Sequence, residues 1–139
     1  MLIGEYQHSL DAKGRLFIPA KLRADLGERF VATKGFDCCV ALYSMEEWKQ
    51  IETKIRQLPI SRAREIQRFL IASADEIVVD AQGRALIPQV LRNYAKLERD
   101  AVVIGVGNRA EIWQPELWQQ ECGNMVPEDI MDHVADLGF

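Results

Sequence analysis

The stretches "DAKGRLFIP" (Asp11–Pro19) and "DAQGRALIP" (Asp80–Pro88) are almost the same, and they indicate how the whole chain is organised. Six of the nine residues are identical, and the two copies begin 69 residues apart in a chain of 139 residues. Self-similarity at a fixed spacing is the signature of a repeated structural unit. The chain is therefore expected to contain one unit written twice.

Further matches follow each stretch in the same order. They are "LR" at Leu22–Arg23 and Leu91–Arg92, "FVATKG" (Phe30–Gly35) with "AVVIG" (Ala101–Gly105), and "VALYSMEEW" (Val40–Trp48) with "AEIWQPELW" (Ala110–Trp118). In each unit, short apolar runs predict strands, and the proline that closes the repeated stretch favours the start of a short helix. The expected strands are Glu5–Leu10, Leu16–Ile18, Phe30–Thr33 and Cys39–Tyr43, then Glu76–Val79, Ala85–Ile87, Ala101–Ile104 and Glu111–Trp113, with short helices from Pro19 through Leu26 and after Pro88.

The segment between the units has helical periodicity instead. Ser44 with Glu47 three residues later forms the pattern of a capping box, and Ser61 is placed to cap a second helix after Pro59. Apolar residues recur at helical spacing in both parts: Trp48, Ile51, Ile55 and Leu58, then Ile66, Phe69 and Leu70. We expect an α+β fold that is mainly β, with a first unit at residues 1–48, a helical connector at 49–73, a second unit at 74–118 and an acidic segment at 119–139.

A unit of this size is close to the lower limit for an independent core. Each unit is therefore expected to bury its faces against its twin, the connecting helices or another subunit, as an intimate pseudo-twofold pair. No apolar run approaches the length of a membrane span, and the N-terminus lacks the pattern of a signal peptide. Three cysteines suit neither a disulfide framework nor a zinc site, so a cytoplasmic protein without metal or cofactor is expected.

The charge of the chain is unevenly distributed. The total is −4, but residues 114–139 carry six acids and no lysine or arginine, so the remainder carries +2. Residues 1–36 contain six basic and four acidic side chains. Because the local potential decides whether a surface attracts phosphate, the negative total does not exclude a polyanionic partner.

The repeated stretch has the composition of a tight loop that presents an arginine. Asp11 and Asp80 can accept hydrogen bonds from backbone amides two or three residues on, and Gly14 and Gly83 fall where a hairpin loop requires a positive φ. Arg15 and Arg84 follow directly. An ion pair that only closes its own loop is the competing interpretation for both arginines, but an exposed lysine at the first tip, Lys13, has no such structural use. The first unit is therefore expected to carry most of the recognition.

The doubled "DxxxR", with "GRLFIP…LR" and "GRALIP…LR" after it, resembles the MraZ family of bacterial transcriptional regulators, made of two tandem AbrB-like (SpoVT-AbrB) domains. The resemblance covers Leu2 through about Trp118. It implies swapped β-hairpins in a pseudo-twofold barrel, a ring-shaped homo-oligomer, and binding to direct repeats in double-stranded DNA at the promoter of its own division and cell-wall operon. Asp11, Arg15, Asp80 and Arg84 match the two signatures, whereas Gln82 departs from a basic tip.

On this basis Lys13 and Arg15 are expected to reach DNA, one to phosphate and the other to a guanine edge in the major groove. Arg84 is a further candidate, and Lys21, Arg23 and Lys34 are candidates for flanking phosphate contacts, although a solvated face remains the competing interpretation for these three. Such a protein would be nucleoid-associated and would have no small-molecule substrate.

Other functions have weaker support. "GVGNRA" at 105–110 contains G-x-G-x-x-A after an apolar strand, but the next residues predict another strand rather than the helix that a dinucleotide site requires. His8 is expected to be an exposed strand residue, Cys38 and Cys39 small apolar residues, and the three tryptophans packing residues, so no enzyme is indicated. The alternative is an AbrB-fold module that oligomerises or binds a protein without binding DNA.

Overall fold

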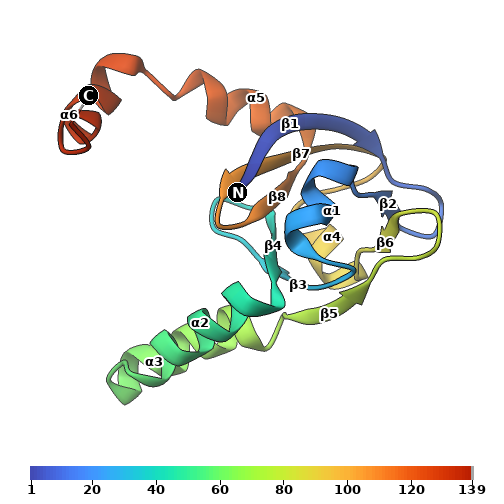
Figure 1. Cartoon of the computed structure of the whole chain (residues 1–139), viewed down its shortest axis with the longest axis horizontal. Helices are drawn as coiled ribbons and strands as arrows, with labels where there is room; N and C mark the ends of the chain where they lie inside the picture. The colour runs from blue at the N-terminus through green and yellow to red at the C-terminus, as the bar shows by residue number, and fades with distance from the viewer. Residues whose placement is uncertain (139) are drawn as a thin grey trace.

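The computed structural model describes residues 1–138, and its elements follow the same order in both halves of the chain (Figure 1). The first half contains β1 (Leu2–Ser9), β2 (Arg15–Phe17), α1 (Ala20–Leu26), β3 (Arg29–Lys34) and β4 (Val40–Ser44). The second half contains β5 (Asp75–Val78), β6 (Arg84–Leu86), α4 (Gln89–Tyr94), β7 (Asp100–Gly107) and β8 (Ala110–Trp113). The predicted strands all occur, most within one or two residues of the expected bounds.

The strands form one six-stranded sheet and one two-stranded ribbon. The sheet has the order β1-β7-β8-β4-β3-β5 with every neighbouring pair antiparallel, and β2 pairs with β6. The first strand of each half pairs with the other half, β1 with β7 and β5 with β3. When each strand is replaced by its repeat counterpart, the same order is obtained, read from the opposite edge of the sheet. The expected α+β, mainly β class is confirmed, with the strands in an open antiparallel sheet.

Equivalent residues of the two halves meet in one core. Leu16, Ile18 and Leu22 of the first half and Ala85, Ile87 and Leu91 of the second are almost completely buried in the same cluster. In the ribbon, Leu16 lies opposite Ala85, and both point inward, away from the partly exposed arginines on either side. Because alternate residues of a strand face opposite sides, this burial fixes which side chains β2 and β6 present outward.

The connector consists of α2 (Met45–Arg56), α3 (Ile60–Ile66) and a π-helical turn, η1 (Gln67–Ile71). Ser44 caps α2 as predicted, since its Oγ accepts a hydrogen bond of 3.2 Å from the Glu47 amide. The prediction that Ser61 caps the second helix is wrong: α3 begins at Ile60 with Pro59 as its N-cap and no side-chain cap. Pro59 holds the extended backbone of the N-cap position, so the helix begins before Ser61, which therefore lies inside α3.

Two further helices, α5 (Pro115–Gly123) and α6 (Pro127–Ala135), carry the chain away from the sheet (Figure 1). In the described part of the chain, no helix is long and apolar enough to cross a membrane. Both repeated prolines precede the helices they were expected to begin, because Pro19 and Pro88 are N-caps of α1 and α4. Each helix therefore begins one residue later than predicted. The proline still sets its start, because the ring fixes φ near −50° to −60°.

Candidate nucleic-acid interface

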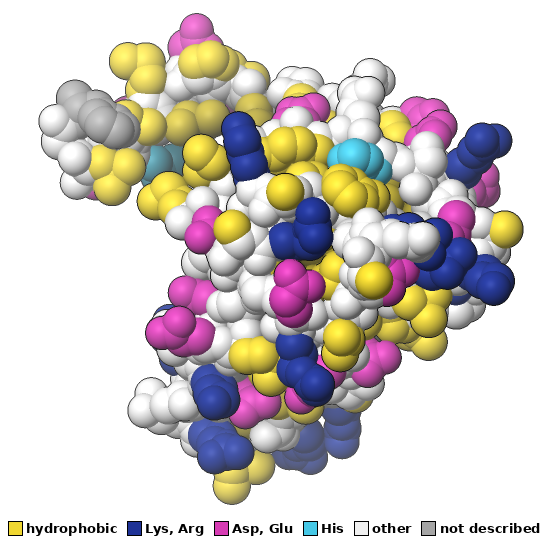
Figure 2. Space-filling view, turned by 45° about the vertical axis from the view of Figure 1, so that its right-hand side comes forward, with side chains coloured by type: hydrophobic (Ala, Val, Ile, Leu, Met, Phe, Trp, Pro, Cys, Tyr) yellow, Lys and Arg dark blue, Asp and Glu magenta, His cyan; other side chains and the backbone are white. Residues whose placement is uncertain are grey.

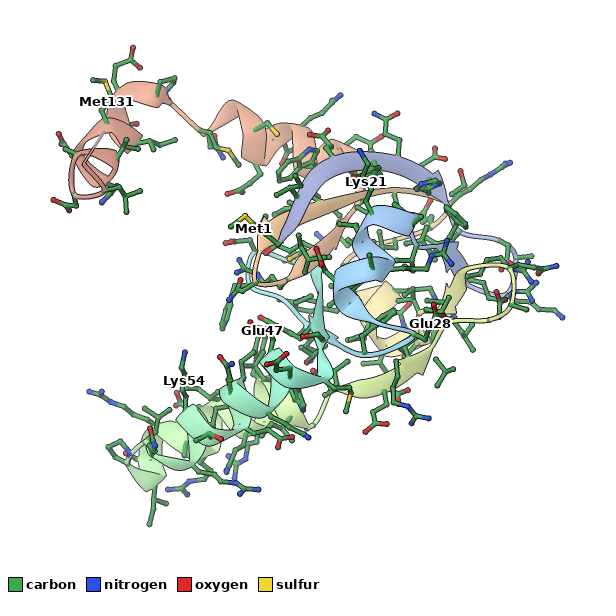
Figure 3. All side chains as sticks on the ribbon, viewed as in Figure 1. Met1, Lys21, Glu28, Glu47, Lys54 and Met131 are labelled. Carbon is green, nitrogen blue, oxygen red and sulfur yellow. The ribbon has the colours of Figure 1, made fainter. Side chains whose placement is uncertain are left out.

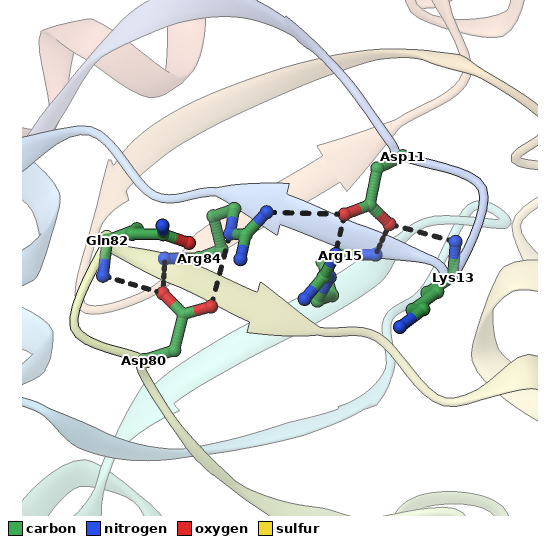
Figure 4. Close-up of polar contacts among 6 residues, drawn as sticks. All are labelled: Asp11, Lys13, Arg15, Asp80, Gln82 and Arg84. Carbon is green, nitrogen blue, oxygen red and sulfur yellow. Dashed lines mark hydrogen bonds and ion pairs between the residues drawn. The ribbon is translucent and has the colours of Figure 1, made fainter.

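The loop from Asp11 to Arg15 is closed around one carboxylate (Figure 4). Asp11 Oδ1 accepts hydrogen bonds of 2.9 Å from the backbone amides of Lys13 and Arg15, and its Oδ2 accepts one of 2.7 Å from Arg15 Nε. The Gly14 amide donates to the Asp11 carbonyl at 3.0 Å, which completes the turn with Gly14 at φ 84°. The carboxylate therefore orients the loop and the guanidinium together.

The loop from Asp80 to Arg84 repeats this arrangement. Asp80 Oδ1 accepts from the amides of Gln82 and Arg84 at 2.9 Å, and its Oδ2 accepts from Arg84 Nε at 3.1 Å. Gly83 has φ 81°. Figure 4 shows the two loops at opposite ends of the β2–β6 ribbon, with Arg15 and Arg84 between the two tips. The second loop has Gln82 where the first has Lys13, and the two loops have the same geometry.

The outward face of the ribbon combines two arginines with two apolar side chains. Arg15 lies directly opposite Leu86, and Phe17 directly opposite Arg84. The side chains of Arg15 and Arg84 are 31% and 30% exposed, while Phe17 and Leu86 are exposed as large hydrophobics. Arg84 Nη1 also lies 3.6 Å from Asp11 Oδ2, so the loops are coupled across the ribbon. The four side chains form what we call the ribbon face.

The glycine of each loop packs against an arginine of the opposite half, and each arginine is held by a hydrogen bond to its own half. Arg23 Nε donates to the Ile18 carbonyl at 3.0 Å and Arg92 Nε to the Ile87 carbonyl at 2.8 Å. A β-carbon at Gly14 would lie 2.5 Å from Arg92 Cζ, and one at Gly83 would lie 3.1 Å from Arg23 Cζ. The positive φ favours glycine at both positions, and a side chain there would also displace the packed arginine.

The ribbon end of the molecule is basic. Hydrogen bonds from the backbone amides of Arg15 and Arg84 are the largest cause that lowers the pKa of Asp11 and of Asp80, respectively, so both carboxylates are ionised at neutral pH. Against these two negative charges stand five basic residues: Lys13, Arg15, Arg23, Arg84 and Arg92. Figure 2 shows Lys and Arg side chains gathered on the side of the molecule where the two loops lie.

The other predicted basic residues are placed differently. Arg23 lies beside the ribbon, with Cζ 5.5 Å from the centroid of the Phe17 ring. Lys21 is exposed on α1, and Figure 3 shows it apart from the loops. Lys34 Nζ lies 5.7 Å from the Phe69 ring centroid and 5.4 Å from that of Tyr94, between η1 and α4. The structure thus brings Lys13, Arg15, Arg23 and Arg84 together, and leaves Lys21 and Lys34 outside that group.

Arg92 and Phe17 were not among the predicted site residues. Arg92 is the repeat counterpart of Arg23, and the alignment of the two "LR" pairs could have identified it. The position of Phe17 follows from strand alternation, since Arg15 and Phe17 are two residues apart and must share a face. The same alternation places Leu86 beside Arg84.

The competing motifs have structural explanations. "GVGNRA" belongs to the β7–β8 hairpin, in which Gly105 pairs with Ala110, so the predicted strand follows the glycines. Trp48 and Trp113 are buried, and Trp113 and Trp118 pack with ring centroids 5.4 Å apart. His8 is half-buried rather than exposed, with its ring 5.2 Å from that of Phe17.

The two adjacent cysteines differ from each other. Cys39 is buried, and burial raises the pKa of its thiol to about 12, so it is an inert apolar residue as expected. Cys38 is exposed in the turn between β3 and β4, at φ 62°, so it does not pack as an apolar residue in the way that Cys39 does. Neither cysteine lies on the ribbon.

Comparison with known proteins gives one family for the whole chain. The model of the family described as "MraZ protein, putative antitoxin-like" matches twice, at residues 1–69 and 70–136. Three relatives are each named "Transcriptional regulator MraZ": from Thermoanaerobacter sp. (strain X514), 50% identical over 100% of both chains; from Acetivibrio thermocellus, 51% identical over 100% of both; and from Heliobacterium modesticaldum, 50% identical over 98% of both. The family resemblance found in the doubled "DxxxR" is confirmed.

Proposed function

The chain belongs to the MraZ family, and we propose that it is a sequence-specific DNA-binding transcriptional regulator, binding direct repeats in the promoter of its own division and cell-wall operon as a ring-shaped oligomer. The names of its relatives support the role in transcription. As part of the proposal, residues 1–48 and 74–118 are two AbrB-like units that exchange hairpins in a pseudo-twofold barrel. The cross-pairing of β1 with β7 and of β5 with β3 supports this assignment.

The ribbon face is the observation that carries the proposal. The major groove of B-DNA admits a two-stranded β-ribbon, and the base edges of a guanine are recognised by an arginine through two hydrogen bonds. In both Arg15 and Arg84, Nε is occupied by the carboxylate of its own loop. The terminal nitrogens of Arg15 can then meet a base while the carboxylate holds the guanidinium in place, so the loop-closing ion pair and the recognition role are compatible. In Arg84, Nη1 also lies 3.6 Å from Asp11 Oδ2, which leaves Nη2 as the terminal nitrogen outside the ion pairs.

Contacts with phosphate surround this centre in the proposal. Lys13 is exposed at the first loop tip, and Arg23 and Arg92 flank the ribbon. Such contacts position a protein on DNA without specifying the sequence. Lys21 and Lys34 are then solvated or structural residues, because they lie off the ribbon face. The neutral Gln82 makes the second loop the weaker contact, while Arg84 keeps the same orientation as Arg15.

One chain offers few contacts, so binding should depend on repetition. Several identical ribbons in one ring would meet tandem repeats in the DNA at high effective concentration, and affinity would rise without new kinds of contact. A nucleoid-associated protein follows from this function. The acidic segment after Gln114 carries no lysine or arginine and has no part in DNA contact.

The proposal is tested by titrating promoter DNA at several salt concentrations. Arg15→Ala should lose about 1–3 kcal/mol of preference for the direct-repeat DNA over a scrambled duplex. Lys13→Ala should weaken both duplexes alike and make the plot of log K against log salt shallower by about one unit for each phosphate that Lys13 neutralises in the complex. Lys21→Ala removes an exposed lysine that lies apart from the loops, so it is the matched control and should leave both quantities unchanged.

Equal binding by the wild type, Arg15→Ala and Lys13→Ala would contradict this assignment. The alternative function, an AbrB-fold module that oligomerises or binds a protein without DNA, predicts that the wild type passes through heparin and promoter-DNA columns without retention. Retention that decreases with rising salt is the result expected for the regulator.

A further inference from the structure

Helix α6 presents an apolar surface that the described chain does not cover. None of its residues is buried, and in Figure 1 it lies away from the sheet. Val126, Ile130 and Val134 recur at intervals of four residues, so they share one side of the helix. Met131 and Leu137 lie beside them and are 65% and 73% exposed. We call these five residues the apolar stripe.

The remainder of α6 and its C-terminal flank is negatively charged. Glu128 and Asp129 border the apolar stripe on its two sides, and Asp132 and Asp136 lie on the side of the helix away from it. None of the four forms an ion pair within residues 1–138. A helix with an uncovered apolar stripe and unpaired carboxylates has the surface of one half of an interface.

The helical connector has the opposite charge. Residues 45–71 contain four acids and six basic residues, and all six basic side chains are exposed: Lys49, Lys54, Arg56, Arg62, Arg64 and Arg68. Within the described chain, none of the six forms an ion pair. Helix α3 has no buried residue, and Ile60 at its start is 82% exposed. Figure 2 shows basic side chains gathered on this part of the molecule.

We propose that α6 of one copy docks on the outer surface of α2, α3 and η1 of a second copy, with the apolar stripe over Ile60 and the bordering carboxylates of Glu128 and Asp129 beside the arginines. The inference rests on the oligomer in the proposed function and names the surfaces that build it. Figures 1 and 3 show α6, with its labelled Met131, and the connector, with Lys54, at separate ends of the molecule. The complementary surfaces are thus available to two different copies.

A second copy fits these surfaces better than other occupants. DNA and anionic membranes are repelled by the four carboxylates of α6, and the chain itself supplies a basic surface with an exposed apolar residue. The contact joins two different faces, so it is head-to-tail, and repetition of such a contact closes into a ring when the rotation between copies permits. The ribbon takes no part in the contact and stays available to DNA.

The test is charge exchange in the full-length protein. The connector variant carries Arg62→Glu and Arg64→Glu, the α6 variant carries Glu128→Arg and Asp129→Arg, and the exchanged variant carries all four. Sedimentation velocity over a series of concentrations gives the mass of the assembly and its dissociation constant. Because like charges then face each other, each of the first two variants should raise that constant roughly tenfold or more. The exchanged variant should restore assembly.

Matched controls separate this effect from a general change of charge. Glu98→Arg and Arg99→Glu reverse exposed charges on the sheet-bearing part of the chain, and should leave the assembly unchanged. Circular dichroism should show the same secondary structure for all variants, since every substituted side chain is exposed. Rising salt should weaken the wild-type assembly, because exposed charge pairs are screened.

The inference is overturned if either single-surface variant assembles like the wild type, if the exchanged variant fails to recover, or if the wild type is monomeric throughout. Binding to a duplex with one repeat is measured separately and reports the ribbon alone. Loss of assembly with retained single-repeat binding, followed by recovery in the exchanged variant, supports the docking contact. Failure of all variants and the wild type to bind promoter DNA would overturn the proposed function and leave the docking result standing.

Discussion

At the scale of single residues, one aspartate in each loop performs two tasks. Its carboxylate accepts the backbone amides that close the turn, and it also holds Nε of the arginine that follows. The loop and the side chain it presents are therefore organised by the same charge. This explains why the second copy keeps Asp80 and Arg84 although its tip residue is neutral.

Gly14 holds a backbone conformation that residues with a side chain rarely adopt. Gly14→Ala should lower the free energy of unfolding by about 1–3 kcal/mol, because φ is 84° and the new methyl group would meet Arg92 Cζ at 2.5 Å. Gly123→Ala is the control, since no atom lies within 4 Å of a β-carbon there. Urea denaturation measures both. A Gly14→Ala protein as stable as the control would show that the loop adopts another conformation.

The pH dependence of the loops follows from the two carboxylates. Their folded-state pKa values are lowered from 3.8, so the stability they contribute is fully present above pH 3.8 and is lost as pH falls through the lower folded value. Carboxyl-carbon NMR titration should give midpoints for Asp11 and Asp80 below those of the same carbons in the urea-unfolded chain. Midpoints equal to or above the unfolded values would contradict the closed loop.

At the scale of elements, the two serines expected to cap helices have different fates. Ser44 accepts from the Glu47 amide, whereas Ser61 lies inside α3 after Pro59 and caps nothing. Ser44→Ala should lower the free energy of unfolding by about 1 kcal/mol, and Ser61→Ala should change it by much less. Thermal or urea denaturation of the two variants measures the difference. Equal losses would mean that Ser44 contributes no cap energy.

Most elements could be predicted because their causes are local. The strands follow from apolar runs, and α1 and α4 follow from a proline that fixes the backbone before the helix. Strand β1 extends back to Leu2, beyond its predicted start at Glu5, since its long partner β7 supplies hydrogen bonds along the whole length. Two features could not be predicted from short stretches of sequence because they depend on tertiary packing. They are the π-helical turn at Gln67–Ile71 and the packing of Arg92 against Gly14.

At the scale of the whole molecule, the two halves share one core and one sheet. Neither half has its own complete set of strand partners, so we expect them to unfold together. A variant with Trp48 as its only tryptophan and one with only Trp113 report on different halves. For each variant, the urea midpoint from tryptophan fluorescence should equal the midpoint from circular dichroism. The two variants should also share one midpoint once the shift caused by the substitutions themselves is subtracted. Separate midpoints would show independent halves.

The pairing of β1 with β7 also matters while the protein is being made. Asp100, where β7 begins, is synthesised 91 residues after Ser9, where β1 ends. At usual rates of translation this interval lasts roughly 5–20 s, during which the first strand leaves the ribosome without its neighbour. Chains that grow side by side on one messenger RNA each expose this open strand edge, which can be captured by another chain until the second half arrives.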